Sequence, residues 1–277
     1  MIRTPTALDL DPDPDLWRKD ALGVEHAREP DARIVCLVPS ITELLCDLGL
    51  GDRLVGRTGF CIHPKEALER VSKVGGTKSV NIEKIRQLAP SHVIVNVDEN
   101  EKPTADVLAQ FVPNVVVTHP QHPLDNLKLY RLFGHVFGAE ARAAQLCDRF
   151  KAAYTRLSGA SFTPRSVLYL VWKDPWMTVS PATYIGSSLG LVRWHQIATE
   201  GEKRYPTIDL QRVAPQVELI LLSSEPYRFG SQDQVELAQA FPRQRVLLVD
   251  GEMLSWYGSR AIAGLDYLRR LASGDFD

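Results

Sequence analysis

The stretch "RIVCLVPSITELLCDLGLGDRLVG", residues 33–56, decides the fold. An apolar run ends at Pro39 and Ser40, and apolar residues recur immediately afterwards at helical spacing. Ser40 and Glu43 have the spacing of a capping box, in which each side chain accepts from the backbone N–H of the other residue. We therefore predict a strand that turns directly into a helix, as in the repeating units of a parallel α/β sheet.

The corner at Pro39 and Ser40 has two interpretations. The capping box accounts for the residue types by itself. The corner also follows the carboxyl end of a strand, and open parallel sheets bind ligands at that edge, against helix amino termini. The residues of the corner leave both interpretations open.

Strand and helix patterns alternate along the rest of the chain, which predicts βα units and parallel sheets. In the first half the strands are expected at 33–38, 53–57, 92–97 and 114–118, and the helices at 42–48, 82–88, 103–111 and 124–137. In the second half the strands are expected at 166–172, 218–223 and 245–250, and the helices at 183–191, 210–213, 234–241 and 259–272.

One long helix is predicted over 139–159, because apolar residues recur there at helical spacing without an internal Gly or Pro. It would be either a buried crossover helix or a spine between two lobes, about 30 Å long. The alternation restarts after it, and 209–224 resembles 81–97, so we favour two similar lobes. The predicted domains are an irregular lead-in (1–31), an N-terminal α/β lobe (32–138), the linking helix (139–159) and a C-terminal α/β lobe (160–277).

The composition is that of an ordinary globular protein. The 277 residues are 44% hydrophobic and 24% charged with a net charge of −2, so nucleic acid is not an expected partner. Four cysteines without a C-x-x-C pair indicate reduced thiols. No apolar stretch approaches the roughly 20 residues that span a bilayer, so the protein is not expected to be membrane-embedded. The amino terminus lacks a signal-peptide pattern, which predicts a cytoplasmic protein; a periplasmic one with a truncated start is the alternative.

Aromatic residues gather in the loops of the second half, at positions where a strand gives way to a helix. They are Trp172, Trp176, Tyr184, Trp256 and Tyr257. Several aromatics at equivalent loop positions indicate a stacking surface for a large planar or amphipathic ligand.

Motifs for catalysis or metal binding are absent from the sequence. Cys61 and His63 form a C-x-H pair without partners at zinc spacing, so no metal site is predicted. His119 and His122 are expected in a solvated loop, and His195 in the core. No G-x-S-x-G, phosphate-loop, G-x-G-x-x-G or H-E-x-x-H motif occurs, so an enzyme is not expected. The alternative is a cytoplasmic enzyme or a metal-ion-binding protein on the same scaffold, with Cys61 and His63 as its reactive residues.

Seven segments follow one another in an order that is typical of a known family. They are "RIVCLVPSITELLCDLGLGDRLVG", "FCIHP", "KVGGTKSVNIEKI", "APSHVIVNVDEN", "PWMTVSPATYIG", "YPTIDLQRV" and "SWYGSR". Together they resemble the helical-backbone (class III) substrate-binding proteins for cobalamin, ferric siderophores and haem, over about residues 21–272. The likeness is greatest to the branch described as cobalamin-binding proteins or helical-backbone metal receptors.

The resemblance implies an α/β protein of two Rossmann-like lobes with parallel sheets, joined by one long backbone helix. It further implies a non-catalytic receptor that holds a corrinoid, a haem-like ligand or a ferric chelate in the cleft between the lobes, with no covalent cofactor. The positions that match ligand contacts of the family are Pro39, Ser40, Phe60, His63, Thr77, Trp172, Trp176, Tyr184, Trp256 and Tyr257.

Transporter-coupled members of that family carry one glutamate per lobe, which pairs with arginines of an ABC transporter permease. Glu83, two residues after Asn81, matches the first of these. The second position, two residues after Asp209, is Gln211, and an amide cannot form the ion pair. The chain is therefore expected either not to dock on a permease or to tolerate this one substitution.

Overall fold

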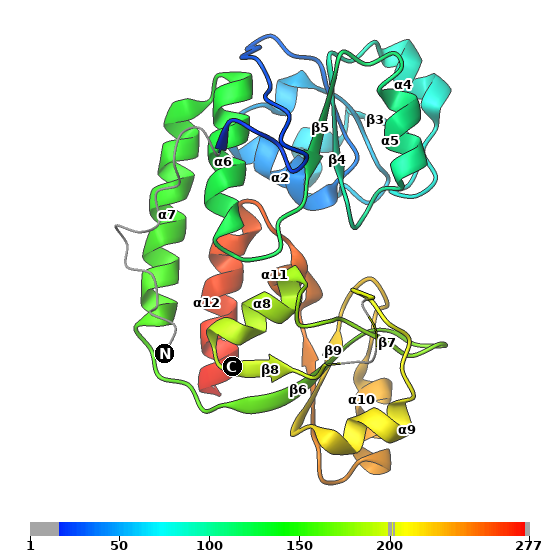
Figure 1. Ribbon diagram of the computed structural model, residues 1–277, viewed down its shortest axis with the longest axis vertical. Coiled ribbons are helices and arrows are strands. Elements are labelled where there is room, and N and C mark those ends of the chain that lie inside the picture. Colours follow the sequence, from blue (N-terminus) through cyan, green and yellow to red (C-terminus); the bar gives the residue numbers. More distant parts are fainter. Residues whose placement is uncertain (1–16, 199–200, 202, 275–277) are drawn as a thin grey trace. The chain divides into compact units, whose positions relative to one another are not determined.

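The computed structural model describes residues 17–198, 201 and 203–274. The chain divides into two compact units that exchange short segments. Unit 1 comprises Met1–Pro120, Leu124–Lys151 and Tyr257–Arg260, and unit 2 comprises Gln121–Pro123, Ala152–Trp256 and Ala261–Asp277. Helix α7 (Glu140–Ser158), the predicted long helix, begins in unit 1 and ends in unit 2 (Figure 1). The fold is therefore α/β in two lobes joined by one long helix, as expected.

Unit 1 is built on a sheet of five parallel strands in the order β3-β2-β1-β4-β5. The strands are β1 (Ile34–Cys36), β2 (Leu54–Arg57), β3 (Ser72–Lys73), β4 (His92–Asn96) and β5 (Asn114–Thr118). The helices that connect them are α2 (Pro39–Asp47), α3 (Lys65–Leu68), α4 (Ile82–Leu88), α5 (Lys102–Leu108) and α6 (Asp125–Phe137), with a 3₁₀ turn η2 (Gly51–Arg53).

The sheet of unit 1 is covered by helices on both faces. Val35, Val93 and Val95 lie on the face against which α4 and α5 pack, while α2 and α6 lie on the opposite side of the sheet (Figure 1). Strands buried on both faces need apolar residues at consecutive positions, as at 34–36 in β1 and 93–95 in β4.

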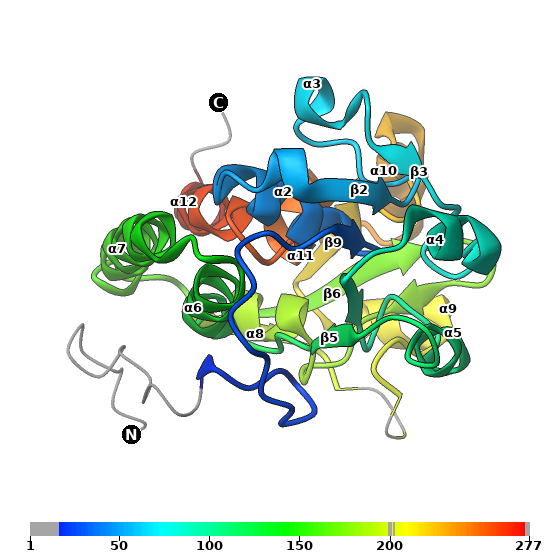
Figure 2. The same cartoon turned by 90° about the horizontal axis from the view of Figure 1, so that it is seen from above.

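Helices α6 and α7 lie side by side in both views (Figures 1 and 2). A Cβ on Gly134 would lie 2.5 Å from the Cβ of Ala143, so the absence of a side chain at this position lets the two helices approach closely.

Unit 2 repeats the plan with the strand order β10-β9-β6-β7, and β8 also pairs with β6. All pairs are parallel except β6 with β7. The strands are β6 (Arg165–Trp172), β7 (Met177–Thr178), β8 (Trp194–Gln196), β9 (Leu219–Ser223) and β10 (Arg245–Val249). The helices are α8 (Tyr184–Leu191), α9 (Leu210–Val213), α10 (Ser231–Ala240), α11 (Gly251–Ser255) and α12 (Arg260–Ser273), with a 3₁₀ turn η3 (Ala214–Gln216).

The repeated sequence pattern corresponds to a repeated local structure. Asn81 caps α4 by accepting from the backbone N–H of Lys84, and Asp209 caps α9 by accepting from those of Gln211 and Arg212. Each short helix leads into a fully buried strand, β4 or β9, which pairs with the first strand of its own unit.

Two predictions about side chains are wrong. The residue that caps α2 is Val38, because Pro39 lacks an N–H and takes the first helical position, which leaves Ser40 inside the first turn. Glu43 does not reach back to Ser40 and instead pairs with Arg260. His195 is exposed rather than in the core, because side chains alternate along β8 and Trp194 and Gln196 take the buried face.

Part of the predicted lead-in, residues 1–16, lies outside the described residues. The described part is anchored on β5 by Asp20, which is 3% exposed. Its carboxylate accepts from the backbone N–H groups of Leu22, Val24 and Val117, and contacts His26 Nε2 at 3.2 Å. These bonds hold an otherwise irregular segment against the edge of the sheet.

The segment Tyr257–Arg260 is held within unit 1 by buried polar contacts. The Gly258 N–H donates to Asn126 Oδ1 at 2.6 Å, and its carbonyl accepts from the Tyr130 hydroxyl at 2.8 Å. Arg260 donates to both carboxylate oxygens of Glu43, at 2.7 and 2.8 Å. Gly258 has φ +84°, and a Cβ there would lie 3.0 Å from the carbonyl oxygen of Ser40.

We predict that Gly258→Ala lowers the melting temperature by about 4 °C or more, because it adds both backbone strain and a clash with α2. Thermal unfolding followed by circular dichroism measures the change. Gly190→Ala in α8 is the matched control, since a Cβ at that position meets nothing within 4 Å and Ala is the better helix former. Equal melting temperatures for Gly258→Ala and the wild type would contradict the role given to this glycine.

Candidate functional site

The sequence-predicted site residues lie mostly in loops that follow the carboxyl ends of strands. In a parallel sheet these loops meet at one edge, and ligands of open α/β folds bind there. The two units each have such an edge.

The first corner of unit 1 is formed by Pro39 and Ser40 at the start of α2. Pro39 is half-buried, and Ser40 is 3% exposed. Within the described part of the chain, the Ser40 hydroxyl has no hydrogen-bond partner. A buried hydroxyl of this kind is costly to leave unsatisfied, so the corner holds an unused donor and acceptor beside the helix amino terminus.

The loop after β2 exposes Phe60 to solvent, while the residues on either side of it are held by hydrogen bonds. The Arg57 guanidinium donates to the backbone carbonyls of Thr58, Cys61 and Leu68. Cys61 is fully buried, and its Sγ accepts from Thr42 Oγ1 at 3.1 Å. Phe60 is left 63% exposed. An exposed aromatic side chain on an anchored loop is suited to contact with an apolar ligand.

The other predicted residues of unit 1 surround this loop without forming a cluster of charges. His63 and Thr77 are both half-buried. The Asn100 side chain donates to the backbone carbonyls of Thr77 and Leu37, at 2.9 and 3.4 Å, which ties the loop after β3 to the end of β1. Glu83, on α4, is exposed and lies 3.7 Å from Arg86.

Unit 2 has a continuous aromatic cluster at the carboxyl end of β6. Trp172 packs edge-on against Tyr227 with 5.7 Å between ring centroids, and Tyr227 lies 4.7 Å from Phe229. Trp176 stacks on Phe229 at 6.0 Å with an interplanar angle of 4°. Trp172 is the most exposed of the four, at 39%, while Trp176 and Tyr227 are half-buried and Phe229 is buried. The four residues Trp172, Trp176, Tyr227 and Phe229 are called the aromatic cluster below.

Lys173 holds the aromatic cluster against α10. Its ammonium group lies 2.7 Å from Asp233 and 3.3 Å from Glu236, and 5.8 Å from the centroid of the Trp176 ring. The two acidic partners raise the pKa of Lys173. These contacts link Trp176 of the aromatic cluster to α10.

Tyr227 and Phe229 are functional candidates that sequence reasoning missed. The signal available was their alternation in "SSEPYRFGS", residues 223–231, a loop at the same edge as the other aromatic residues. What could not be read from the sequence is that this loop folds back against the end of β6, where the Tyr227 N–H donates to the carbonyl of Val171.

The three remaining aromatic residues of the predicted site are buried. Tyr184 and Trp256 are each 8% exposed, in unit 2, and Tyr257 is 7% exposed, in unit 1. The Trp256 indole N–H donates to Glu225 Oε1 at 2.7 Å, and the Tyr257 hydroxyl donates to Glu99. Gln211, by contrast, is exposed on α9.

The alternative site at Cys61 and His63 has little chemical support. Burial raises the pKa of the Cys61 thiol, which disfavours the thiolate that a nucleophile or metal ligand needs. Among residues 17–198, 201 and 203–274, no three His, Cys, Asp or Glu side chains are grouped so that they could hold a metal ion. In the same part of the chain, every helix is too short or too polar to cross a lipid bilayer.

Comparisons with known proteins agree with one another. The family model described as periplasmic binding protein matches residues 34–244. The chain is similar to an uncharacterized ABC transporter substrate-binding lipoprotein of Bacillus subtilis, with 27% identity over 87% of this chain and 79% of that one. It is also similar to the vitamin B12-binding protein of Photorhabdus laumondii, with 25% identity over 85% of this chain and 86% of that one.

Solved structures with the same fold include those of two periplasmic binding proteins. The periplasmic vitamin B12-binding protein of Vibrio cholerae has a TM-score of 0.72 at 20% identity, over 88% of this chain and 98% of that one. The periplasmic heme-binding protein of Roseiflexus sp. RS-1, in its apo form, has a TM-score of 0.74 at 22% identity, with the same coverage. At these identities the structures establish the shared fold.

Glu225 gives the edge of unit 2 a pH-dependent stability. Burial raises its pKa, and the nearby charges of Glu252 and Asp250 act in the same direction, while hydrogen bonds from Ser255 and Trp256 oppose the shift. A raised pKa means that ionising Glu225 costs more in the folded protein than in the unfolded chain. The cost is absent below the ordinary pKa of Glu and grows as the pH rises through the folded-state pKa.

We predict that Glu225→Gln melts at a higher temperature than the wild type at pH 8 and at the same temperature at pH 4. Gln removes the charge but keeps a carbonyl oxygen that accepts from Ser255 and Trp256, which now bond to Oε1 at 2.7 Å. Melting curves across this pH range measure the difference. Glu66→Gln, an exposed substitution on α3, should show no such pH-dependent gain. A melting temperature at pH 8 that is higher for the wild type than for Glu225→Gln would contradict the prediction.

Proposed function

Because the chain belongs to the periplasmic binding protein family, we propose that it is a non-catalytic receptor for a corrinoid such as cobalamin, with a haem-like or ferric chelate as the next most suitable ligand class. The observation that carries the ligand class is the aromatic cluster with its exposed Trp172. Corrinoids, haem and aryl chelates are large and amphipathic, and aromatic side chains contribute large contact areas to such ligands. The vitamin B12-binding relatives support the order of preference.

The proposed apolar contacts come from Trp172 and Trp176 in unit 2 and from Phe60 in unit 1. Trp172 is the last residue of β6, and Phe60 and Trp176 lie in the loops that follow β2 and β6. The neighbours of each are held by hydrogen bonds or ring packing. Side chains positioned in advance lose little conformational entropy when the ligand binds.

The proposed polar contacts come from the first corner and its neighbours. Ser40 offers a buried hydroxyl with no partner in the described chain, at the amino terminus of α2. Pro39, His63 and Thr77 are half-buried at the same edge. A hydroxyl and a helix amino terminus suit an amide or carboxylate group on the rim of a macrocycle.

Tyr184 and Trp256 in unit 2 and Tyr257 in unit 1 are proposed to support the ligand-contacting residues of their own units. They are buried, and the polar atoms of Trp256 and Tyr257 already donate to Glu225 and Glu99. Substituting them is therefore expected to lower the stability of the fold more than the affinity for the ligand.

The family description and the lipoprotein relative favour export over the expected cytoplasmic location, so we propose a periplasmic-type receptor. The enzyme alternative is the weaker one, since its candidate thiol, Cys61, is buried with a raised pKa.

We predict that Trp172→Ala weakens cyanocobalamin binding by about ten-fold or more, as expected for the loss of an aromatic contact at the centre of a site. Isothermal titration calorimetry with cyanocobalamin, and in parallel with haemin, measures the affinity and separates the two ligand classes. Leu248→Ala is the matched control, because Leu248 is also 39% exposed and lies on β10 of the same unit. Saturable binding that is the same in both variants and the wild type would remove the aromatic cluster from the site.

Docking on a permease is proposed to be weak, because only one of the two family positions carries a charge. Glu83 and Gln211 are both exposed. Asp209 does not replace the missing charge, since its carboxylate faces the backbone N–H groups of Gln211 and Arg212 at 3.0 and 3.4 Å.

We predict that Gln211→Glu strengthens binding to a detergent-solubilised vitamin B12 or haem permease of the same host several-fold, and that Glu83→Gln weakens it. Surface plasmon resonance at two salt concentrations measures both effects, and the gain should shrink as salt screens the ion pair. Gln87→Glu, also exposed but outside the matched positions, serves as the control. Affinities that change equally for Gln87→Glu and Gln211→Glu would show a general charge effect and no docking role for position 211.

A further inference from the structure

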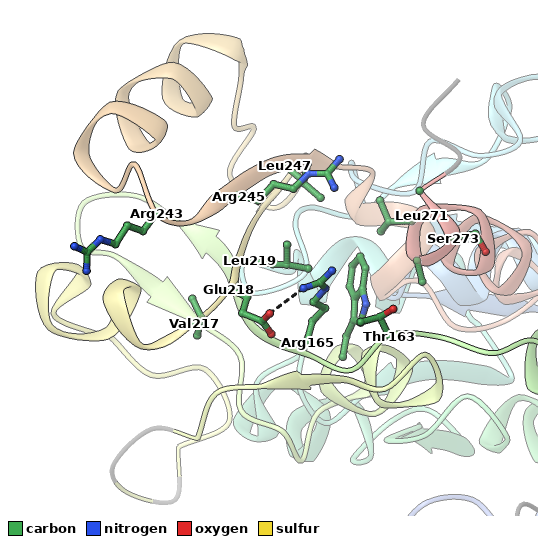
Figure 3. A pocket seen from close by; sticks show the side chains of 13 residues that line it. Thr163, Arg165, Val217, Glu218, Leu219, Arg243, Arg245, Leu247, Leu271 and Ser273 are labelled. Atoms are coloured by element: carbon green, nitrogen blue, oxygen red, sulfur yellow. Dashed lines mark hydrogen bonds and ion pairs between the residues drawn. The ribbon is translucent and has the colours of Figure 1, made fainter.

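Unit 2 contains a hollow at the amino-terminal edge of its sheet, the edge opposite to the aromatic cluster (Figure 3). Its volume is about 510 Å³, within the range of small-molecule sites. Arg165 and Trp172 are the first and last residues of β6, so the hollow and the aromatic cluster are separated by about 23 Å at 3.3 Å per residue. The hollow is thus distinct from the proposed receptor site.

The strand register explains why the hollow has its particular lining. Arg165 is paired with Trp194, and Leu219 is paired with Arg245 and with Val167, two residues beyond Arg165. Paired residues of parallel strands point to the same face, as do residues two apart on one strand. Arg165, Trp194, Leu219 and Arg245 therefore form a row on one face of the sheet.

The hollow exists because α12 does not cover the end of this face. The last residues of α12, Leu271 to Ser273, form one wall, and the row of strand residues forms the floor. Trp194, Leu219 and Leu271 are buried at 5 to 6% exposure and make that part of the lining apolar.

The charged side chains of the lining are mostly basic, although the whole chain has a net charge of −2. Among the described residues, the Arg165 guanidinium donates only through Nη1, to Glu218 Oε1 at 2.9 Å, and Glu218 also accepts from the backbone N–H of Ser166. The ion pair orients the Arg165 guanidinium and leaves its other N–H groups for a ligand. Arg243 also lines the hollow, but its side chain points away from Arg165 and Arg245 (Figure 3).

We propose that this hollow binds a small organic anion, with its carboxylate or phosphate group on Arg165 and Arg245 and its apolar body over Trp194 and Leu271. The two arginines begin strands on either side of β9. They are about 10 Å apart across the strands and, because Leu219 pairs with Val167, about 7 Å apart along them. A small molecule with two separated oxyanion groups can therefore meet both guanidinium groups. Guanidinium groups bind carboxylate and phosphate through paired N–H donors.

The polarity of α12 fixes the orientation of the ligand. The carbonyl groups at the carboxyl end of a helix carry partial negative charge and disfavour an anion. The charged group therefore lies toward the strands, and the uncharged part lies toward Leu271 at the end of the helix.

Isothermal titration calorimetry at constant ionic strength tests the proposal on the full chain. The probes are isophthalate for the carboxylate class, phenyl phosphate for the phosphate class, inorganic phosphate as an anion without an apolar body, and benzamide as a neutral ring. We expect isophthalate or phenyl phosphate to bind saturably and more tightly than inorganic phosphate, and benzamide not to bind.

Arg245→Ala and Arg165→Lys should each weaken the better probe by about ten-fold, the latter because Lys keeps the charge but loses the paired donors. Arg243→Ala removes the same charge from the rim and should change the affinity by less than about two-fold. An equal loss in Arg243→Ala, or equal affinity for inorganic phosphate and the organic anions, would overturn the assignment, as would the absence of saturable binding by every probe.

A chain that ends at Gly274 distinguishes a ligand site from a hollow that the chain itself fills, because the sequence continues with Asp275, Phe276 and Asp277. Binding of the probes to both chains supports the proposal, and binding to the shortened chain alone overturns it. Trp172→Ala should leave probe binding unchanged, and Arg245→Ala should leave cyanocobalamin binding unchanged, so failure at either site is recognised separately.

Discussion

Parallel strand pairing is the constraint on which the rest of this structure depends. Each parallel strand must be followed by a crossover that returns the chain to the starting edge, so every loop after a strand emerges at the same edge of its sheet. Both units obey this rule, apart from the short antiparallel strand β7. The exposed Phe60 and the aromatic cluster lie at the carboxyl-terminal edges for this reason. The arginine-lined hollow lies at the opposite edge of unit 2, where strands begin and α12 ends.

The elements of the fold could be predicted from the sequence wherever an apolar period was long enough. The expected helix over 82–88 has the observed bounds of α4, and the expected strand over 114–118 has those of β5. Strands β3, β7 and β8 were not predicted, because each has only two or three residues and none lies in an apolar run like that around β1. The capping box at Ser40 was wrong because the backbone restriction of Pro39 outweighs the preference of a serine for the capping position.

For the candidate site, the sequence predicted which loops and residue types are involved, but not which side chains are exposed. Sequence reasoning placed Phe60 and Trp172 where strands give way to loops. Both are exposed, Phe60 in the loop after β2 and Trp172 as the last residue of β6. Sequence reasoning could not distinguish them from Trp256, which is buried with its indole N–H on Glu225, because exposure depends on partners that are distant in the sequence. The pairing of Arg165 and Arg245 in the hollow could not be predicted either. The two residues are 80 positions apart in the sequence, and only the register of three strands brings them onto one face of the sheet.

The segment Tyr257–Arg260 has a consequence for how the protein is made. Asn126 and Tyr130 lie on a helix that the ribosome completes early, yet their partner Gly258 follows 132 and 128 residues later. The separation is larger for Glu43, whose partner Arg260 is 217 residues downstream. These contacts of unit 1 can therefore form only after almost the whole chain has been synthesised. A chain shortened before Tyr257 would leave Asn126, Tyr130 and Glu43 without these partners.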